Sequence, residues 1–134
     1  MLRGCSSYVI LIVGIVIGLG AFGHASAVRN VHAAVDQCPI DAAIRGTLYI
    51  VWYFVSGCML LFGSLIVWIW FRLRVEDTNS LFIAFLIGLL YVLTGAGGLI
   101  HRHGDPFWLF FVLLSLLLLV SASALRSGDR LENN

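Results

Sequence analysis

The chain has 134 residues, of which 60% are hydrophobic and only 11% are charged, and its mean hydropathy is +1.00. A soluble domain carries about a quarter charged residues, so this composition argues against a soluble enzyme. The formal net charge of +1 provides no basic field that would attract nucleic acid. The composition predicts a single integral membrane domain over residues 1–134, with the lipid bilayer as its surroundings.

Four segments that contain no aspartate, glutamate, arginine or lysine are long enough to cross a bilayer as helices, and the first of them holds one histidine. A membrane span needs about 20 mostly apolar residues, and each segment ends at charged or turn-forming residues. The apolar runs are continuous, as at residues 113–120, whereas strands of a membrane barrel would alternate apolar and polar residues. We therefore predict an all-α polytopic membrane protein, a bundle of four antiparallel transmembrane helices in up-down-up-down order. The predicted spans are residues 8–27, 46–71, 79–100 and 106–125, followed by a frayed polar tail at 126–134.

The first predicted span also has the features of a secretory signal peptide. Arg3 precedes the apolar segment, and Ala25-Ser26-Ala27 matches a cleavage pattern. The apolar segment is slightly long for a signal peptide, and Gly14 and Gly18 form a packing motif, so we expect the span to be retained. Cleavage would instead leave three spans and remove residues 1–27.

The first loop contains a short helical pattern. Three valines recur at helical spacing and predict a short amphipathic helix at the membrane surface. Arg29 and Asp36 fall on its polar face, where they could form an ion pair, and Asp41 is placed to cap the next helix. The valines are Val28, Val31 and Val35.

The arginines predict the orientation, because the chain has no lysine. In the four-span topology, five arginines lie on the side of the two termini and three lie on the other side. The positive-inside rule then places both termini in the cytoplasm, and we expect the protein in the cell membrane, meaning the plasma or inner membrane. The five are Arg3, Arg72, Arg74, Arg126 and Arg130, and the three are Arg29, Arg45 and Arg102.

Small residues mark the helix faces that can pack closely inside a bilayer. The first three spans carry them at helical intervals, whereas the fourth is rich in leucine. We therefore expect the first three helices to form the packed core and the fourth to face lipid. A dimer contact through the same faces is the alternative, with less weight. The predicted packing residues are Gly14, Gly18, Ser56, Gly63, Ala84, Gly88, Gly95 and Gly98.

All four histidines fall on the side of the membrane opposite the termini in this topology. Histidine and carboxylate side chains suit zinc, copper or iron, so a transition-metal site is one hypothesis, and haem held by histidines from two helices is another. The alternative is that the histidines form hydrogen bonds with lipid headgroups and loop carboxylates. The candidate ligands are His24, His32, His101, His103 and Asp105.

No carboxylate, arginine or lysine lies inside a predicted span, so the usual sign of ion-coupled transport is missing from the sequence. Nucleotide-binding and hydrolase motifs are missing too, and we assign no catalytic residue. The sequence favours a non-enzymatic accessory or packing subunit of a larger membrane complex, or a homo-oligomer. The alternatives are a metal- or haem-binding redox protein and a dimeric small-solute transporter with Tyr91 lining its path. The three cysteines lie at three different levels, so no disulfide is expected.

Overall fold

The computed structural model describes residues 2–132, which fold into five consecutive helices. Four helical segments in this part of the chain are long and apolar enough to cross a membrane: Cys5–Val35, Ala42–Leu73, Leu81–His101 and Pro106–Gly128. The prediction of an all-α, four-helix membrane protein with a short helix in the first loop is therefore confirmed. The helices are α1 (Leu2–Ser26), α2 (Val28–Val35), α3 (Ala42–Leu73), α4 (Leu81–His101) and α5 (Pro106–Glu132).

The helices begin and end where local chemistry favours it. Only Ala27 separates α1 from α2, so the two form a nearly continuous helix. At the start of α3, the Asp41 carboxylate accepts a hydrogen bond of 2.7 Å from the backbone N–H of Ala43, as predicted. At the start of α5, the Asp105 carboxylate accepts one of 3.0 Å from the backbone N–H of Phe107. The helix α5 continues to Glu132, into the segment predicted as a frayed tail, of which residues 133–134 lie outside the described part of the chain.

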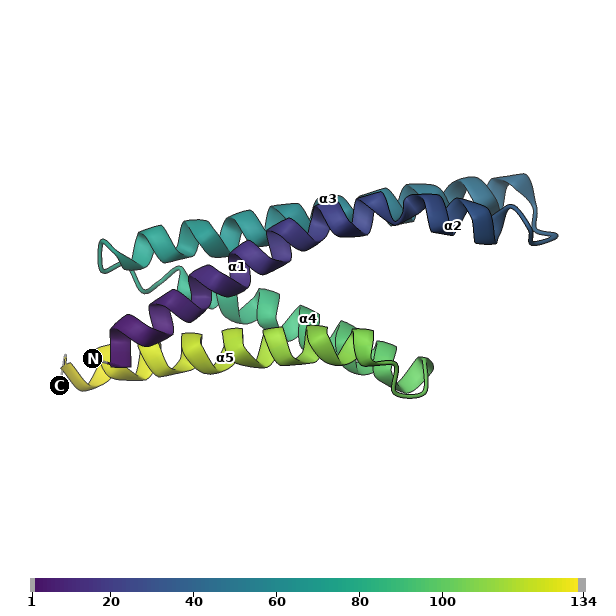
Figure 1. Ribbon diagram of the computed structural model, residues 1–134. Coiled ribbons are helices and arrows are strands. Elements are labelled where there is room, and N and C mark those ends of the chain that lie inside the picture. Colours follow the sequence, from purple (N-terminus) through teal and green to yellow (C-terminus); the bar gives the residue numbers. More distant parts are fainter. Residues whose placement is uncertain (1, 133–134) are drawn as a thin grey trace.

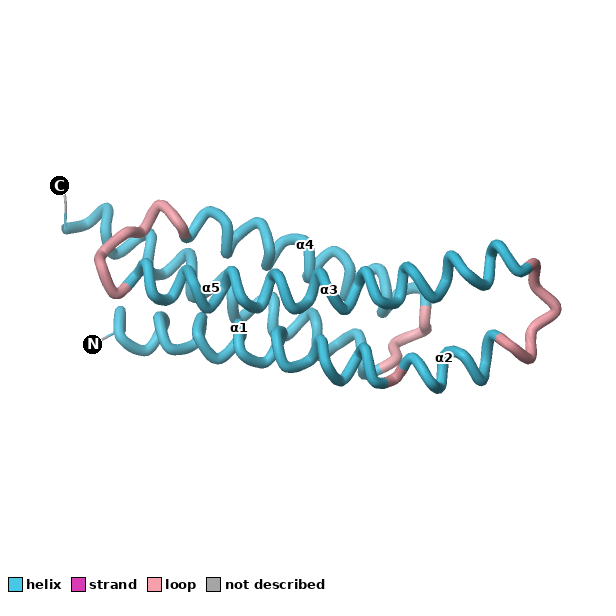
Figure 2. The backbone as a smooth tube through the Cα atoms, turned by 90° about the horizontal axis from the view of Figure 1, so that it is seen from above, coloured by secondary structure: helices cyan, strands magenta, loops and turns pink. Residues whose placement is uncertain are grey.

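The helices are arranged as two hairpins that diverge like the arms of a V. Along one arm, α1 lies against α3, and along the other, α4 lies against α5. The arms meet near the start of α1 and the end of α5, where α1 and α5 touch, and they separate toward the opposite end (Figure 1). Although α3 and α4 are consecutive in the chain, they make little contact with each other. Seen from above, α2 and the start of α3 reach beyond the α4–α5 turn (Figure 2).

Glycines hold the first arm together. The backbones of α1 and α3 meet at Gly14, Gly18 and Gly63, all of which the sequence analysis marks as packing residues. A Cβ atom on Gly63 would lie 2.5 Å from the Gly18 nitrogen and 2.8 Å from the Gly14 carbonyl oxygen, which no real side chain tolerates. Ile66, on the next turn of α3, is completely buried beside this contact. The first arm is therefore a close backbone-to-backbone packing of the kind that small residues permit.

The second arm corrects one expectation from the sequence. The fourth span was predicted to face lipid, but α5 is a full packing partner of α4 and also contacts α1. Ser115 and Leu118 of α5 are each only 1% exposed. The physical reason is that the glycines of α4 form hollows that need large side chains opposite them. Gly88 faces Leu119, Gly95 faces Val112, and Gly98 faces the Trp108 ring.

Candidate functional site

The space between the two arms is the candidate site. A cavity of about 620 Å³, here called the cleft, lies where the arms diverge. Ten side chains from α1, α2 and α3 form one wall, and six from α4 and α5 form the other. The cleft is lined mainly by apolar and aromatic groups. The six on the second wall are Leu90, Tyr91, Thr94, Phe107, Trp108 and Phe111.

Tyr91 is the most deeply placed polar side chain of the cleft, with only 7% of its surface exposed. Its ring stacks on Phe111 at a centroid distance of 5.9 Å and meets the edge of Phe62, on the opposite arm, at 6.2 Å. Among the residues that the structure describes, none forms a hydrogen bond with the Tyr91 hydroxyl group. A hydroxyl without a partner is costly in an apolar environment, so this group favours an occupant of the cleft that offers a hydrogen-bond acceptor.

His24 is fixed to α3 by three separate contacts. Its Nδ1 atom lies 2.8 Å from the Ser56 hydroxyl oxygen, and its ring stacks on Trp52 at a centroid distance of 4.0 Å. The Trp52 indole N–H also donates a hydrogen bond of 2.8 Å to the His24 carbonyl oxygen. These contacts place a polar, hydrogen-bonded group on the wall of an otherwise apolar cleft.

A second polar cluster joins α2 to the start of α3. The His32 ring stacks on Tyr49 at a centroid distance of 3.7 Å, and the Tyr49 hydroxyl donates a hydrogen bond of 2.8 Å to the Asp36 carboxylate. The same carboxylate forms an ion pair with Arg45 at 3.4 Å, rather than the predicted pair with Arg29. The cluster holds α2 against α3, and because Asp36 is exposed and Arg45 is only partly buried, their ion pair contributes little to stability.

The structure does not bring the five candidate metal ligands together. His24 and His32 lie on the first arm, whereas the other three lie at the α4–α5 turn on the second arm, and the two regions are apart in Figure 1. In the described part of the chain, no three histidine, cysteine or acidic side chains are grouped closely enough to hold a metal ion. His101 and His103 are exposed, and the Asp105 carboxylate is used to cap α5.

The aromatic partners of the histidines are not predicted from the sequence. Tyr49, Trp52 and Ser56 lie three and four residues apart, so they share one face of α3, and that spacing could have indicated a line of contacts with α1 and α2. Only Ser56 was singled out, as a packing residue. Comparisons with protein-family models, with curated proteins and with solved structures find no match.

Proposed function

We propose that this protein is a non-enzymatic accessory subunit of a larger membrane complex, and that a transmembrane helix of a partner protein binds in the cleft. The observation that supports this function is the divergence of the two hairpins, which leaves a largely apolar cavity of about 620 Å³ between them. Inside a bilayer, helices associate by side-chain packing and hydrogen bonds rather than by removal of apolar surface from water. A partner helix would gain packing from both walls.

The Tyr91 hydroxyl adds specificity to this binding. A backbone carbonyl or polar side chain of the partner helix would accept the hydrogen bond that no described residue of this chain accepts. A second copy of the same chain is the competing occupant, and it would make the protein a homo-oligomer. We place the protein in the cell membrane with both termini in the cytoplasm, because five of the eight arginines belong to the side of the termini. The cleft then opens away from the cytoplasm.

Photocrosslinking in native membranes tests the proposed docking. A photoreactive phenylalanine analogue replaces Val55, which lines the cleft, or Leu113, which is similarly exposed on α5 but lies outside it. We expect one protein, identified by mass spectrometry, to crosslink at Val55 and not at Leu113. Thr94→Trp, which fills part of the cleft, should lower that yield several-fold.

The mass of the crosslinked product distinguishes the outcomes. An adduct of twice the chain mass would identify a second copy as the occupant. Only lipid adducts at Val55, or the same products at Val55 and Leu113, would contradict helix docking.

A small lipophilic molecule is a second candidate occupant. The cleft volume lies within the range of about 300–1,000 Å³ that is typical of ligand pockets, and Tyr91 offers a single hydrogen bond at its base. Native mass spectrometry of the purified protein would reveal such a molecule as a fixed added mass. Tyr91→Phe, which removes only the hydroxyl, should reduce its retention about tenfold, whereas crosslinking of a partner helix should fall less, because most of that binding comes from packing along both walls.

A further inference from the structure

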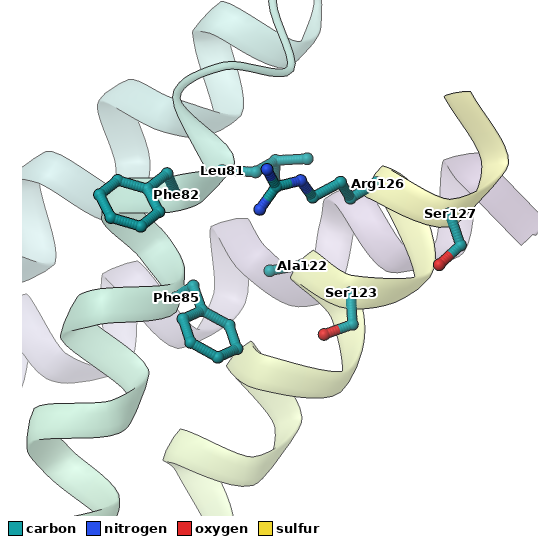
Figure 3. A pocket seen from close by; sticks show the side chains of 7 residues that line it. All are labelled: Leu81, Phe82, Phe85, Ala122, Ser123, Arg126 and Ser127. Carbon is teal, nitrogen blue, oxygen red and sulfur yellow. The ribbon is translucent and has the colours of Figure 1, made fainter. Parts of the chain in front are cut away.

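A second, smaller groove lies at the closed end of the V, between the start of α4 and the last turns of α5. Its volume is about 340 Å³. Leu81 and Ala122 are buried at its base, whereas Phe82 and Phe85 remain about half exposed along its α4 side. Figure 3 shows Arg126 extending from α5 toward the start of α4, with its guanidinium group close to Leu81.

The groove combines one cation with two hydroxyl groups, all three from α5. Ser123 lies three residues before Arg126 and four before Ser127, so it neighbours each of them on the helix surface, and all three side chains line the groove (Figure 3). Within the described residues, Arg126 has no ion-pair partner, and neither serine hydroxyl has a hydrogen-bond partner. These three groups together can donate several hydrogen bonds to one anion.

Two other arginines at this end of the molecule whose side chains the structure describes, Arg72 and Arg74, differ from Arg126. Arg72 forms an ion pair with Asp77 at 2.5 Å, so its charge is neutralised within the α3–α4 turn. Arg74 lies over the Trp70 ring at 5.5 Å. Arg126 alone of the three lines a groove, and that groove is apolar on its other side. An occupant that complements it needs a negative group and an apolar group joined together.

The groove also lies at the boundary between apolar and polar sequence. Arg126 is the first charged residue after the fourth apolar segment, and Leu81 is the first residue of α4 after the polar turn. Arginine side chains at such positions extend toward the headgroup region while their aliphatic part stays on apolar surface. Arg126 is therefore at the depth where lipid phosphates are found.

We propose that this groove binds an anionic phospholipid. The Arg126 guanidinium and the hydroxyls of Ser123 and Ser127 donate hydrogen bonds to the phosphate oxygens, a geometry that suits the planar guanidinium. The acyl chain lies on the exposed rings of Phe82 and Phe85. A lipid with net negative charge is favoured over a zwitterionic one, because the described residues that line the groove include no carboxylate to receive an ammonium group.

Native mass spectrometry of the full-length protein in detergent tests this site. Phosphatidylglycerol and phosphatidylcholine with the same acyl chains are added in equal amounts. We expect the unaltered protein to bind phosphatidylglycerol about tenfold more tightly, Arg126→Gln to lose that preference, and Arg126→Lys to keep part of it. Arg102→Gln, which removes an exposed arginine from the α4–α5 turn, is the matched control and should keep the preference in full.

Two further measurements separate a lipid from a free anion. Phe82→Ala should weaken phosphatidylglycerol binding several-fold if the acyl chain lies in the groove, and millimolar inorganic phosphate should not displace the lipid. Displacement by phosphate together with no effect of Phe82→Ala would identify a simple phosphate site and overturn the lipid assignment. Equal binding of both lipids, or an unchanged preference in Arg126→Gln, would overturn the site altogether.

Discussion

At the scale of single residues, two glycines on the same helix have opposite surroundings. Gly63 lies where the backbones of α1 and α3 touch, and a Cβ atom there would meet Gly18 at 2.5 Å. Gly57, less than two turns earlier on α3, has no atom within 4 Å of the position that a Cβ would occupy. The sequence identified Gly63 as a packing residue from its spacing, but spacing alone could not separate it from Gly57.

Substitution of each glycine by alanine measures this difference. Gly63→Ala must push α1 away from α3, and we expect a loss of about 1–3 kcal/mol in the free energy of unfolding. Gly57→Ala meets no neighbour and replaces a poor helix former, so it should be neutral or stabilising by up to about 1 kcal/mol. Unfolding in mixed micelles, followed by circular dichroism, gives both values. Equal effects of the two changes would mean that the α1–α3 contact is not close.

At the scale of elements, the sequence predicted where the helices lie but not how they pair. Hydropathy and charge are local properties, so the number of spans and most of their bounds followed directly from the residues. Pairing depends on the complementary shapes of two helices. The expectation that helices pack through their small-residue faces wrongly assigned the leucine-rich α5 to the lipid. The hollow at Gly98 is filled by Trp108, so a leucine-rich, aromatic helix is the natural partner of a glycine-rich one.

The α3–α4 turn, which connects the two hairpins, contains a pH-sensitive ion pair. The hydrogen bonds that Arg72 donates hold the pKa of the Asp77 carboxyl below its ordinary value of about 3.9. A lowered pKa in the folded state means that the stabilisation is fully present above the unfolded pKa and is lost as the pH falls through the folded value. The turn is therefore stabilised at neutral pH and loses this contribution in acid.

Thermal unfolding of Asp77→Asn across a pH series tests this contribution. The variant should be slightly less stable than the unaltered protein at pH 6, and the gap should close as the pH falls below the ordinary carboxyl pKa of about 3.9 and through the lowered pKa of Asp77. Glu76→Gln is the control, because the adjacent Glu76 is exposed and has no ion-pair partner in the described chain. A gap that stays constant as the pH falls would exclude the Arg72–Asp77 pair as its cause.

At the scale of the whole molecule, the angle between the hairpins determines which residues can act together. The prediction from the sequence placed the four histidines near one end of a bundle, and it assumed that neighbouring helices stay parallel. His24 lies on the first arm and His101 lies at the end of α4 on the second. Because the arms diverge, the two histidines are held apart (Figure 1). No periodicity in a sequence encodes the angle between two helix pairs, so the cleft itself could not be predicted.

Cysteine labelling tests how the molecule is oriented in its membrane. Cys5 and Cys38 are both exposed, the first near the start of α1 and the second in the α2–α3 connection. In single-cysteine variants on intact cells, an impermeant maleimide should modify Cys38, and Cys5 should react only after permeabilisation. The reverse pattern would place both termini outside. Intact-mass measurement of the same samples detects any loss of residues 1–27, which would refute the four-span bundle.

The length of α3 has a consequence for access to the cleft. Its 32 residues extend about 48 Å, whereas the apolar interior of a bilayer is about 30 Å thick, and even a tilt of about 40° leaves part of α3 outside. The 21 residues of α4 extend only about 32 Å. The wall of the cleft formed by α2 and α3 thus extends further from the apolar interior of the bilayer than the wall that ends at the α4–α5 turn. A molecule that reached the cleft from the water would therefore meet α2 and the start of α3 first, and its shorter way in would be over the α4–α5 turn.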